Sequence, residues 1–237
     1  MLVGAKGSLL RAQKAASTKK VNHMATRPIF ITETGGPALV RVTFIDFTWH
    51  AGMAKSRRQM SMRSLHEAAH AIHPEARILE VSRMSDERMG EKLSAFNLML
   101  EHQLHGQAIS VESAFQASKV FERGGPFLDL LAARPADAKR DPRLKESGRL
   151  TGFRFMGEDW PKEPLTAFYD WTYINALHRH RELASTVTDY DIFTDIAFNP
   201  AKSINCQANA VALYVALVRR GELQLALSSR EAFLRLE

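Results

Sequence analysis

The feature that most constrains the fold is a change in hydrophobic patterning near residue 81. Before it, short β-rich runs occur at residues 28–31 (PIFI), 39–44 (LVRVTF) and 77–81 (RILEV). The first two flank TETGGP, whose Gly-Gly-Pro favours a turn, so they predict a hairpin. After residue 81 helical patterns dominate. The chain is therefore expected to be α+β and mainly helical, with a small β-containing part near the N-terminus.

Helices are expected in seven segments, and the first of them is stopped by Pro74. They are residues 54–72, 111–123, 126–132, 135–140, 162–184, 203–220 and 228–236, with loops at 140–161 and 185–200. No internal repeat and no low-complexity linker divides the chain after residue 24. We expect a basic flexible extension at residues 1–23, an N-terminal elaboration at 24–76, and a main domain at 77–237 packed against it.

The positive charge is concentrated at the start of the chain. The net charge is +6, and residues 1–23 hold five basic residues and no acidic one, which leaves +1 for the rest. This segment reads as a flexible arm, a targeting-like leader, or an upstream extension of a chain starting at Met24, and we favour the last. Overall charge is thus weak evidence for nucleic-acid binding.

The single cysteine, Cys206, excludes an intrachain disulfide and a four-cysteine zinc site, and it fits a reducing compartment. No apolar run approaches the ~20 residues of a membrane span, and no secretory signal is evident. We expect a soluble, cytoplasmic protein without a membrane partner. Phosphate-binding and dinucleotide-binding glycine motifs are missing from the sequence, so no cofactor is expected.

The string HEAAH, residues 66–70, matches a zinc motif in which His66 and His70 share a helix face and Glu67 is the general base. The third ligand is the difficulty, because His73 follows too soon and lies just before Pro74. We therefore favour a basic amphipathic helix and expect no metal.

The start of that helix is a candidate nucleic-acid-binding surface. Lys55, Arg57 and Arg58 supply cations for phosphate contacts, and Trp49 and His50 immediately precede them and offer rings for stacking on bases. The alternative is a solvated helix face, which charge alone favours.

A second candidate site lies in VESAFQASKVF, residues 111–121. On a helix, Glu112, Gln116, Lys119 and Arg123 fall on one narrow stripe. Spacing alone most often indicates a polar outward face. A ligand between Glu112 and Lys119 is the other interpretation, and geometry leaves both open.

The phrase SVESAFQASKVF resembles the signature of the NADAR (YbiA-like) superfamily, and further pieces follow in the family's order. They are EKLSAFNLML upstream, then RPADAKRDPR, Trp160, and DIFTDIAFNPAKSINCQANAVALYVALVRR. The resemblance covers about residues 78–220. Together with FTWHAGMAKSRRQMSMRSLHEAAH, it is closest to the NADAR subgroup encoded beside DarT-type toxins, which ADP-ribosylate guanine in DNA. In that subgroup the NADAR protein is the antitoxin that removes ADP-ribose from the base.

The resemblance implies catalytic roles for three residues. Glu112 suits electrostatic stabilisation or acid/base work at the anomeric carbon. Lys119 suits a nucleophile that forms an imine with the opened ribose, or otherwise a phosphate or hydroxyl contact. Asp195 matches the acid that holds ribose hydroxyls or activates water. Ribose, diphosphate and ring contacts are expected from Ser94, Trp160, Lys139, Arg140 and Asn205.

The chain departs from the family pattern at three positions. Ala95 stands where an asparagine is usual, which removes an amide from the expected pocket, while Phe193 and Ala208 read as packing variants. The resemblance implies ADP-ribosylated DNA as substrate and a cognate DarT-type toxin as a partner. The alternatives are a YbiA-like N-glycosidase of a small riboflavin-pathway metabolite and a non-catalytic binder of ADP-ribose.

Overall fold

The computed structural model describes residues 23–101 and 108–236 of the chain. The strands are β1 (His23–Thr32), β2 (Val40–Trp49), β3 (Ile78–Glu80), β4 (Met99–Glu101), β5 (Ala108–Ser110), β6 (Lys119–Phe121), β7 (Leu150–Phe155), β8 (Glu158–Pro161) and β9 (Ile192–Thr194). The helices are α1 (Lys55–Ile72), α2 (Arg88–Lys92), α3 (Val111–Ala117), α4 (Pro135–Ala138), α5 (Arg143–Glu146), α6 (Ala167–Arg179), α7 (Arg181–Thr186), α8 (Gln207–Arg220), α9 (Leu223–Ala226) and α10 (Arg230–Leu234), with 3-10 turns at Leu128–Leu131 and Val187–Asp189.

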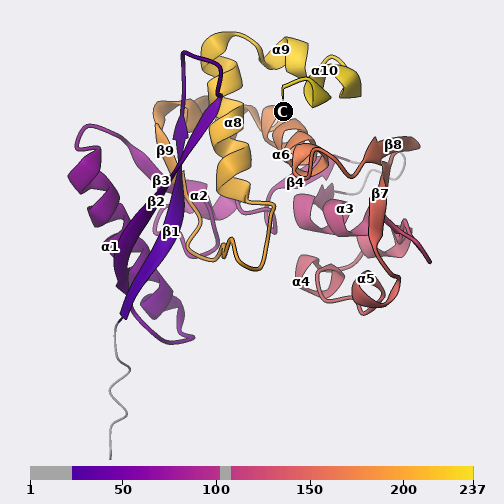
Figure 1. The fold of residues 1–237 in the computed structure, drawn as a ribbon, viewed down its shortest axis with the longest axis horizontal. Coiled ribbons are helices and arrows are strands. Elements are labelled where there is room, and N and C mark those ends of the chain that lie inside the picture. Colours follow the sequence, from indigo (N-terminus) through magenta and orange to yellow (C-terminus); the bar gives the residue numbers. More distant parts are fainter. Residues whose placement is uncertain (1–22, 102–107, 237) are drawn as a thin grey trace, which may run out of the picture.

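A four-stranded sheet lies between the two longest helices (Figure 1). Its strand order is β2-β1-β9-β3, with β1 antiparallel to both of its neighbours and β3 parallel to β9. In the figure α1 covers one side of this sheet and α8 the other, so the arrangement has three layers.

Side-chain alternation in β1 and β9 explains these layers. Ile29, Ile31 and Ile192 pack in a buried apolar cluster with α1. Phe30 and Phe193 belong to the larger cluster that includes α8. Because successive side chains of a strand point to opposite faces, each strand contributes to both cores. Strands buried on both faces have no polar side, which is why they read as short apolar runs.

The larger core continues into a three-stranded sheet of order β6-β7-β8 and a two-stranded sheet of β4 and β5. Its centre is aromatic: the ring of Phe168 on α6 lies 4.6 Å from that of Phe153 and 5.6 Å from that of Trp160, between centroids. Met156 and Gly157 connect β7 to β8 with φ of 51° and 84°. Positive φ at both positions is what a two-residue type I′ turn requires.

The structure confirms the α+β class, the N-terminal hairpin, the first helix and the strand near residue 80. The prediction of a mainly helical protein overstates the helical content, because the six strands β4 to β9 follow residue 81, where only helices and loops are predicted. The loops expected at residues 140–161 and 185–200 were wrong: the first contains α5, β7 and β8, and the second contains β9.

Helix ends also differ from the prediction. The helix expected over residues 111–123 ends at Ala117, since residues 119–121 pair with β7 as β6, where Lys119 lies opposite Phe153. The helix expected over residues 162–184 begins later and is interrupted at His180, whose φ of −87° and ψ of 76° are not helical.

The remaining boundaries bear on the domain prediction. The basic extension predicted at residues 1–23 lies outside the described residues except for His23. The division of the chain at residue 76 stays a prediction; β1 and β2, which precede it, share one sheet with β3 and β9, which follow it. Within the described ranges, no helix combines the length and the apolar character needed to cross a bilayer.

Candidate active site

Helix α3 is buried along its whole length, and this decides how its polar stripe is oriented. All seven of its residues are buried, and Glu112 and Gln116 are only 4% and 5% exposed. The helix is covered by α4, α6 and the 3-10 turn at Leu128–Leu131. The interpretation of the stripe as an outward polar face was therefore wrong: Glu112 and Gln116 face the protein interior.

A hydrogen-bonded chain joins the polar residues of this segment. Lys119 Nζ donates to Gln116 Oε1 at 2.7 Å, and Gln116 Nε2 donates to Glu112 Oε1 at 2.7 Å. Lys139 Nζ lies 3.3 Å from the other oxygen, Glu112 Oε2, and forms an ion pair with it. Lys119 reaches back from β6 to do this, so it is not the helical neighbour that the sequence predicted. Arg123 lies beyond β6 and donates to the carbonyl of Glu146 instead.

Burial changes the chemistry of Lys119. Desolvation lowers the pKa of its ammonium group from 10.5 to about 8; Glu112 opposes this shift and the charge of Lys139 adds to it. Its Nζ also lies 4.6 Å from the centroid of the Phe115 ring. An amine with this pKa is partly unprotonated near neutral pH, which is the form that acts as a nucleophile.

Asp195, the first residue after β9, is 9% exposed and held by hydrogen bonds. Its Oδ1 accepts from the backbone N–H groups of Ala197 and Phe198 at 2.9 and 3.2 Å, and its Oδ2 accepts from Gln207 Nε2 at 2.9 Å. Burial raises the pKa of its carboxyl group, while those hydrogen bonds and Lys139 counteract the rise.

The backbone of Ala95 connects the two acidic residues. Its N–H donates to Gln207 Oε1 at 2.8 Å, and its carbonyl accepts from the backbone N–H of Glu112 at 2.9 Å. Gln207 thus spans from Asp195 to Ala95, and Ala95 continues to α3. The structure brings Glu112, Lys119, Lys139 and Asp195 into one connected site, although their catalytic roles stay predictions.

The half-buried ring of Phe96 belongs to the same site. The guanidinium carbon of Arg83 lies 4.3 Å from its centroid and Lys139 Nζ lies 5.3 Å from it. Neither Phe96 nor Gln207 was among the predicted site residues. Phe96 directly follows the Ser94-Ala95 pair, and Gln207 directly follows Cys206, so both stood inside segments that had already been singled out.

The family of the chain follows from a family model. The model of the DarT1-associated NADAR antitoxin matches residues 25–237. The chain belongs to this family. No curated protein matches it in sequence. Two of its departures from the family pattern, Phe193 and Ala208, are fully buried in the antitoxin's core, where a change of side chain acts through packing.

The predicted substrate contacts of the antitoxin are not all gathered at the site. Ser94 is 2% exposed and lies next to Ala95, whereas Arg140 is exposed. Trp160 is 3% exposed and packs in the aromatic core, with its ring centroid 4.8 Å from that of Trp171 and the two rings tilted by 43°. Asn205 is half-buried, and its Oδ1 has no hydrogen-bond partner among the described residues.

The predicted nucleic-acid-binding residues lie at the end of β2 and the start of α1. Lys55 is exposed and pairs with Glu91 at 3.2 Å, while Arg57 and Arg58 are half-buried. Trp49 is half-buried with the guanidinium of Arg27 5.4 Å from its ring centroid. The backbone N–H of His50 donates to Ser61 Oγ at 2.9 Å.

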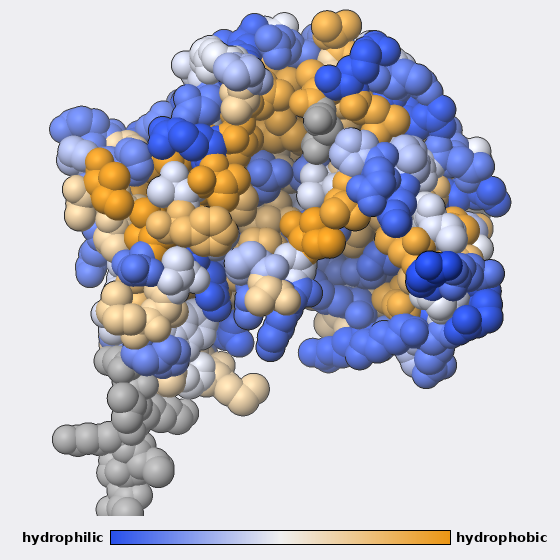
Figure 2. Space-filling view, viewed as in Figure 1, coloured by the Kyte–Doolittle hydropathy of each residue, from blue (hydrophilic) through white to orange (hydrophobic). Residues whose placement is uncertain are grey.

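The start of α1 lies at the lower edge of the view in Figure 1, on the same side as α4. Figure 2 shows this edge hollowed between the part formed by the hairpin and α1 and the part formed by α4 and α5. Hydrophilic side chains stand on both sides of the hollow, which we call the lower notch.

The histidines of HEAAH have separate environments in the antitoxin. His66 Nε2 lies 2.8 Å from Thr194 Oγ1, whereas His70 is exposed. Burial, together with His70, lowers the pKa of His66 to about 4, so its ring is neutral at physiological pH. Among the described residues, no cluster of three or more histidine, cysteine or acidic side chains has a geometry suited to a metal ion.

Proposed function

We propose that this antitoxin is an ADP-ribosyl glycohydrolase that hydrolyses the N-glycosidic bond between ADP-ribose and guanine in DNA. One observation carries the proposal: a half-buried lysine of lowered pKa is hydrogen-bonded through Gln116 to a buried glutamate, and Asp195 is joined to the same site. Membership of the DarT1-associated family supports guanine-linked ADP-ribose in DNA as the substrate and a DarT-type toxin as the source of that substrate.

In the proposed reaction the neutral amine of Lys119 attacks C1 of the ribose. The C1–N bond to guanine breaks, its electron pair stays on the base nitrogen, and that nitrogen takes up a proton. The Lys119 nitrogen loses one proton, and the C1–O bond of the ribose ring then breaks while the ring oxygen takes up the second proton of that nitrogen, which gives an imine and a free hydroxyl group. Water then adds to C1 and the amine leaves, so the sum of the steps is hydrolysis to free ADP-ribose and an unmodified guanine that stays in the DNA.

The two acidic residues have complementary roles in this proposal. Only the side chain of Gln116 separates Glu112 from Lys119. The carboxylate of Glu112 is therefore close enough to C1 to stabilise the positive charge that develops there. Burial raises the pKa of Asp195, which suits a group that gives up and takes back a proton, and the hydrogen bonds from backbone N–H groups and Gln207 orient its carboxylate. We assign water activation to Asp195 on these grounds.

The surface at the start of α1 is proposed to bind the DNA strand. Lys139 directly follows α4, which lies across the lower notch from the start of α1 (Figures 1 and 2), and its side chain is 55% exposed although it pairs with Glu112. Cations on both sides of a hollow suit a phosphate backbone that crosses it. A small metabolite would need neither the basic start of α1 nor the notch.

Release of ADP-ribose tests the proposal directly. Incubation of the antitoxin with ADP-ribosylated single-stranded DNA should yield free ADP-ribose and unmodified DNA. Glu112→Gln and Lys119→Ala should each abolish release with melting temperatures close to that of the wild type. A folded wild-type protein that binds ADP-ribose without releasing it would instead be a non-catalytic ADP-ribose-binding module.

Reductive trapping tests the role of Lys119. With cyanoborohydride present during turnover, the imine should be reduced, and mass spectrometry should find ADP-ribose attached to the peptide that contains Lys119. Lys145→Ala, which removes an exposed lysine on α5, is the matched control and should still be trapped. Attachment at another lysine, or none during active turnover, contradicts the nucleophilic role.

Competition tests the class of substrate. Unmodified DNA added to the release assay should compete with the modified strand, and a lack of competition would favour the riboflavin-pathway N-glycosidase.

A further inference from the structure

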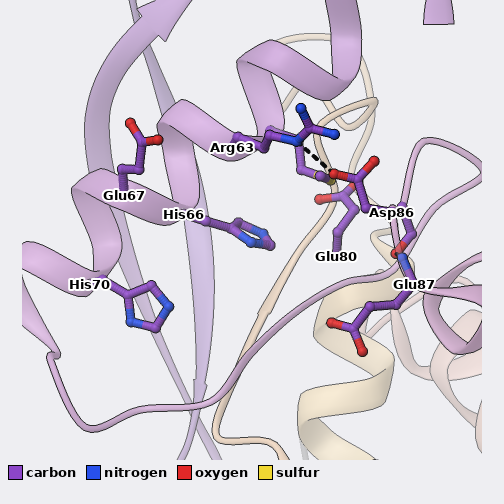
Figure 3. Close-up of a pocket in the computed structure, with 9 residues that line it drawn as sticks. Arg63, His66, Glu67, His70, Glu80, Asp86 and Glu87 are labelled. Atoms are coloured by element: carbon purple, nitrogen blue, oxygen red, sulfur yellow. Dashed lines mark hydrogen bonds and ion pairs between the residues drawn. The ribbon is translucent and has the colours of Figure 1, made fainter. Parts of the chain in front are cut away.

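A cavity of about 290 Å³ lies between α1 and the segment that follows β3. Figure 3 shows His66 projecting from α1 toward Glu80, while Glu67 points away from it. At the mouth of the cavity Arg63 Nε donates to Asp86 Oδ2 at 2.7 Å. The cavity is distinct from the site around Lys119, and Glu80 at its inner wall is only 1% exposed.

A hydrogen-bonded chain runs inward from this cavity. His66 Nε2 lies 2.8 Å from Thr194 Oγ1, and the Thr194 hydroxyl is hydrogen-bonded to Glu80 Oε2 at 2.7 Å. A hydroxyl group has one proton: if Thr194 gives it to an ionised Glu80, His66 Nε2 donates to Thr194, and if a protonated Glu80 donates to Thr194, the hydroxyl donates to Nε2. The other carboxyl oxygen, Glu80 Oε1, accepts from the backbone N–H of Ile196 at 2.9 Å and also from Ser82 Oγ.

These hydrogen bonds hold the backbone both before and after Asp195. Thr194 precedes Asp195 and Ile196 follows it, and Glu80 binds both. Strand pairing adds to the constraint, because Glu80 lies opposite Thr194 in the parallel pair of β3 and β9, and the N–H of Val81 donates to the Thr194 carbonyl at 2.7 Å. Alternation along β9 directs Thr194 toward α1 and leaves Asp195 to face Gln207 on α8.

We propose that Glu80, Thr194 and His66 are positioning residues for Asp195, fixing its backbone from the α1 side of the sheet while its carboxylate faces the substrate. This inference rests on the proposed hydrolase activity. It also gives the HEAAH histidine a role that requires no metal: His66 supports the active site through the sheet.

The protonation of Glu80 agrees with this role. Burial, and then the charge of Asp195, raise the pKa of Glu80, and its three hydrogen-bond donors reduce the rise without cancelling it. A protonated Glu80 places no second negative charge beside Asp195. Glutamine has the same shape and is neutral, so it should replace Glu80 with little loss.

Thr194→Val is the principal test, because valine has the same shape and lacks only the hydroxyl group. We expect kcat for release of ADP-ribose from modified single-stranded DNA to fall on the order of 10²-fold, as for a misplaced catalytic group. KM and the affinity for free ADP-ribose should be unchanged. Thr194→Ser and Glu80→Gln should retain kcat. Glu67→Gln, an identical chemical change in the wall of the same cavity, is the control and should behave as wild type.

Three results would overturn the positioning role. The first is an unchanged kcat in Thr194→Val. The second is a loss of kcat, ADP-ribose affinity and melting temperature together in that variant, and the third is an inactive Glu80→Gln variant. If Thr194→Val does not fold, His66→Ala decides in its place: lower kcat at unchanged KM supports the role and unchanged kcat overturns it. No release by the wild-type protein would overturn the proposed function itself, and this inference with it.

Discussion

At the scale of single residues, the amide of Gln116 sets the electrostatics of the site. Its carbonyl accepts from Lys119 and its amino group donates to Glu112, so it separates the lysine from the carboxylate by one neutral group. A direct contact between the two charges would favour the protonated lysine, because an opposite charge nearby stabilises the charged form. Desolvation lowers the pKa of Lys119, and the bridging amide prevents the direct contact with Glu112 that would offset more of this shift.

The pH dependence of the reaction follows from this pKa. Lys119 attacks only when neutral, and its pKa is about 8. We expect kcat to rise as pH increases through about 8 and to level off above it, because protonation inactivates the amine below that pH. Release of ADP-ribose measured across the neutral and alkaline range checks this prediction. A rate that falls through the same range would contradict it.

Replacing the bridging amide should move this profile. Gln116→Glu adds a carboxylate beside Lys119, which raises the pKa of the lysine and shifts the rising part of the profile to higher pH. At neutral pH the rate should fall roughly tenfold for each pH unit of displacement. Gln224→Glu, at an exposed position on α9, makes the same change away from the site and should leave the profile in place. Superimposable profiles for the two variants would refute the assignment.

At the scale of elements, the start of α3 links stability to the site. Ser110 is the N-cap of α3, and its Oγ accepts from the backbone N–H of Ser113 at 3.0 Å. Ser110→Ala should lower the free energy of unfolding by about 1 kcal/mol and should also lower kcat, since α3 carries Glu112. Ser229 caps α10 in the same way, so Ser229→Ala is the matched control. It should lose similar stability in chemical denaturation while kcat stays unchanged.

Because the start of α1 is basic, we expect its contact with DNA to depend on salt concentration. Arg57→Ala combined with Arg58→Ala should weaken binding of modified and unmodified single strands alike, and should reduce the slope of log affinity against log salt by about 2. Titrations at several salt concentrations measure this slope. Arg179→Ala combined with Arg181→Ala removes two exposed charges at the junction of α6 and α7 and serves as control. Equal slopes for the two double variants would exclude α1 from the DNA interface.

The elements that the sequence predicted correctly are those with strong local signals. The hairpin had its Gly-Gly-Pro turn, and α1 had a long periodic pattern that ends before Pro74. Strand β9 is short and lies among polar residues, so only pairing with β1 and β3 defines it. The hairpin of β7 and β8 turns at Met156-Gly157, which lacks the usual Asn-Gly or Asp-Gly signal.

The site was predictable only in part, for a related reason. Resemblance supplied Glu112, Lys119 and Asp195, but helical spacing gave the wrong route from Glu112 to Lys119. Pairing of residues 119–121 with β7 overrides the local helix preference, and such tertiary pairing is not visible in a sequence window. Gln207 was missed because its role depends on a contact with Ala95, far away in the sequence.

At the scale of the whole molecule, β9 joins the two apolar cores. Its Ile192 belongs to the cluster under α1 and its Phe193 to the cluster under α8. Phe193→Ala should cost about 3–5 kcal/mol of unfolding free energy and should displace Asp195, so activity should fall together with stability. Chemical denaturation followed by the release assay checks both. A stable Phe193→Ala protein of normal activity would show that β9 is not the link between the cores.

The place of β9 between β1 and β3 also bears on how the antitoxin is made. Its partners come from the start of the described chain, whereas β9 and the Gln207 that holds Asp195 come from near its end. Contacts so distant in sequence form late in folding. On the ribosome, the Asp195 half of the site therefore cannot assemble until Gln207 and the rest of α8 have emerged from the exit tunnel, and a nascent chain that ends before Gln207 lacks this half of the site.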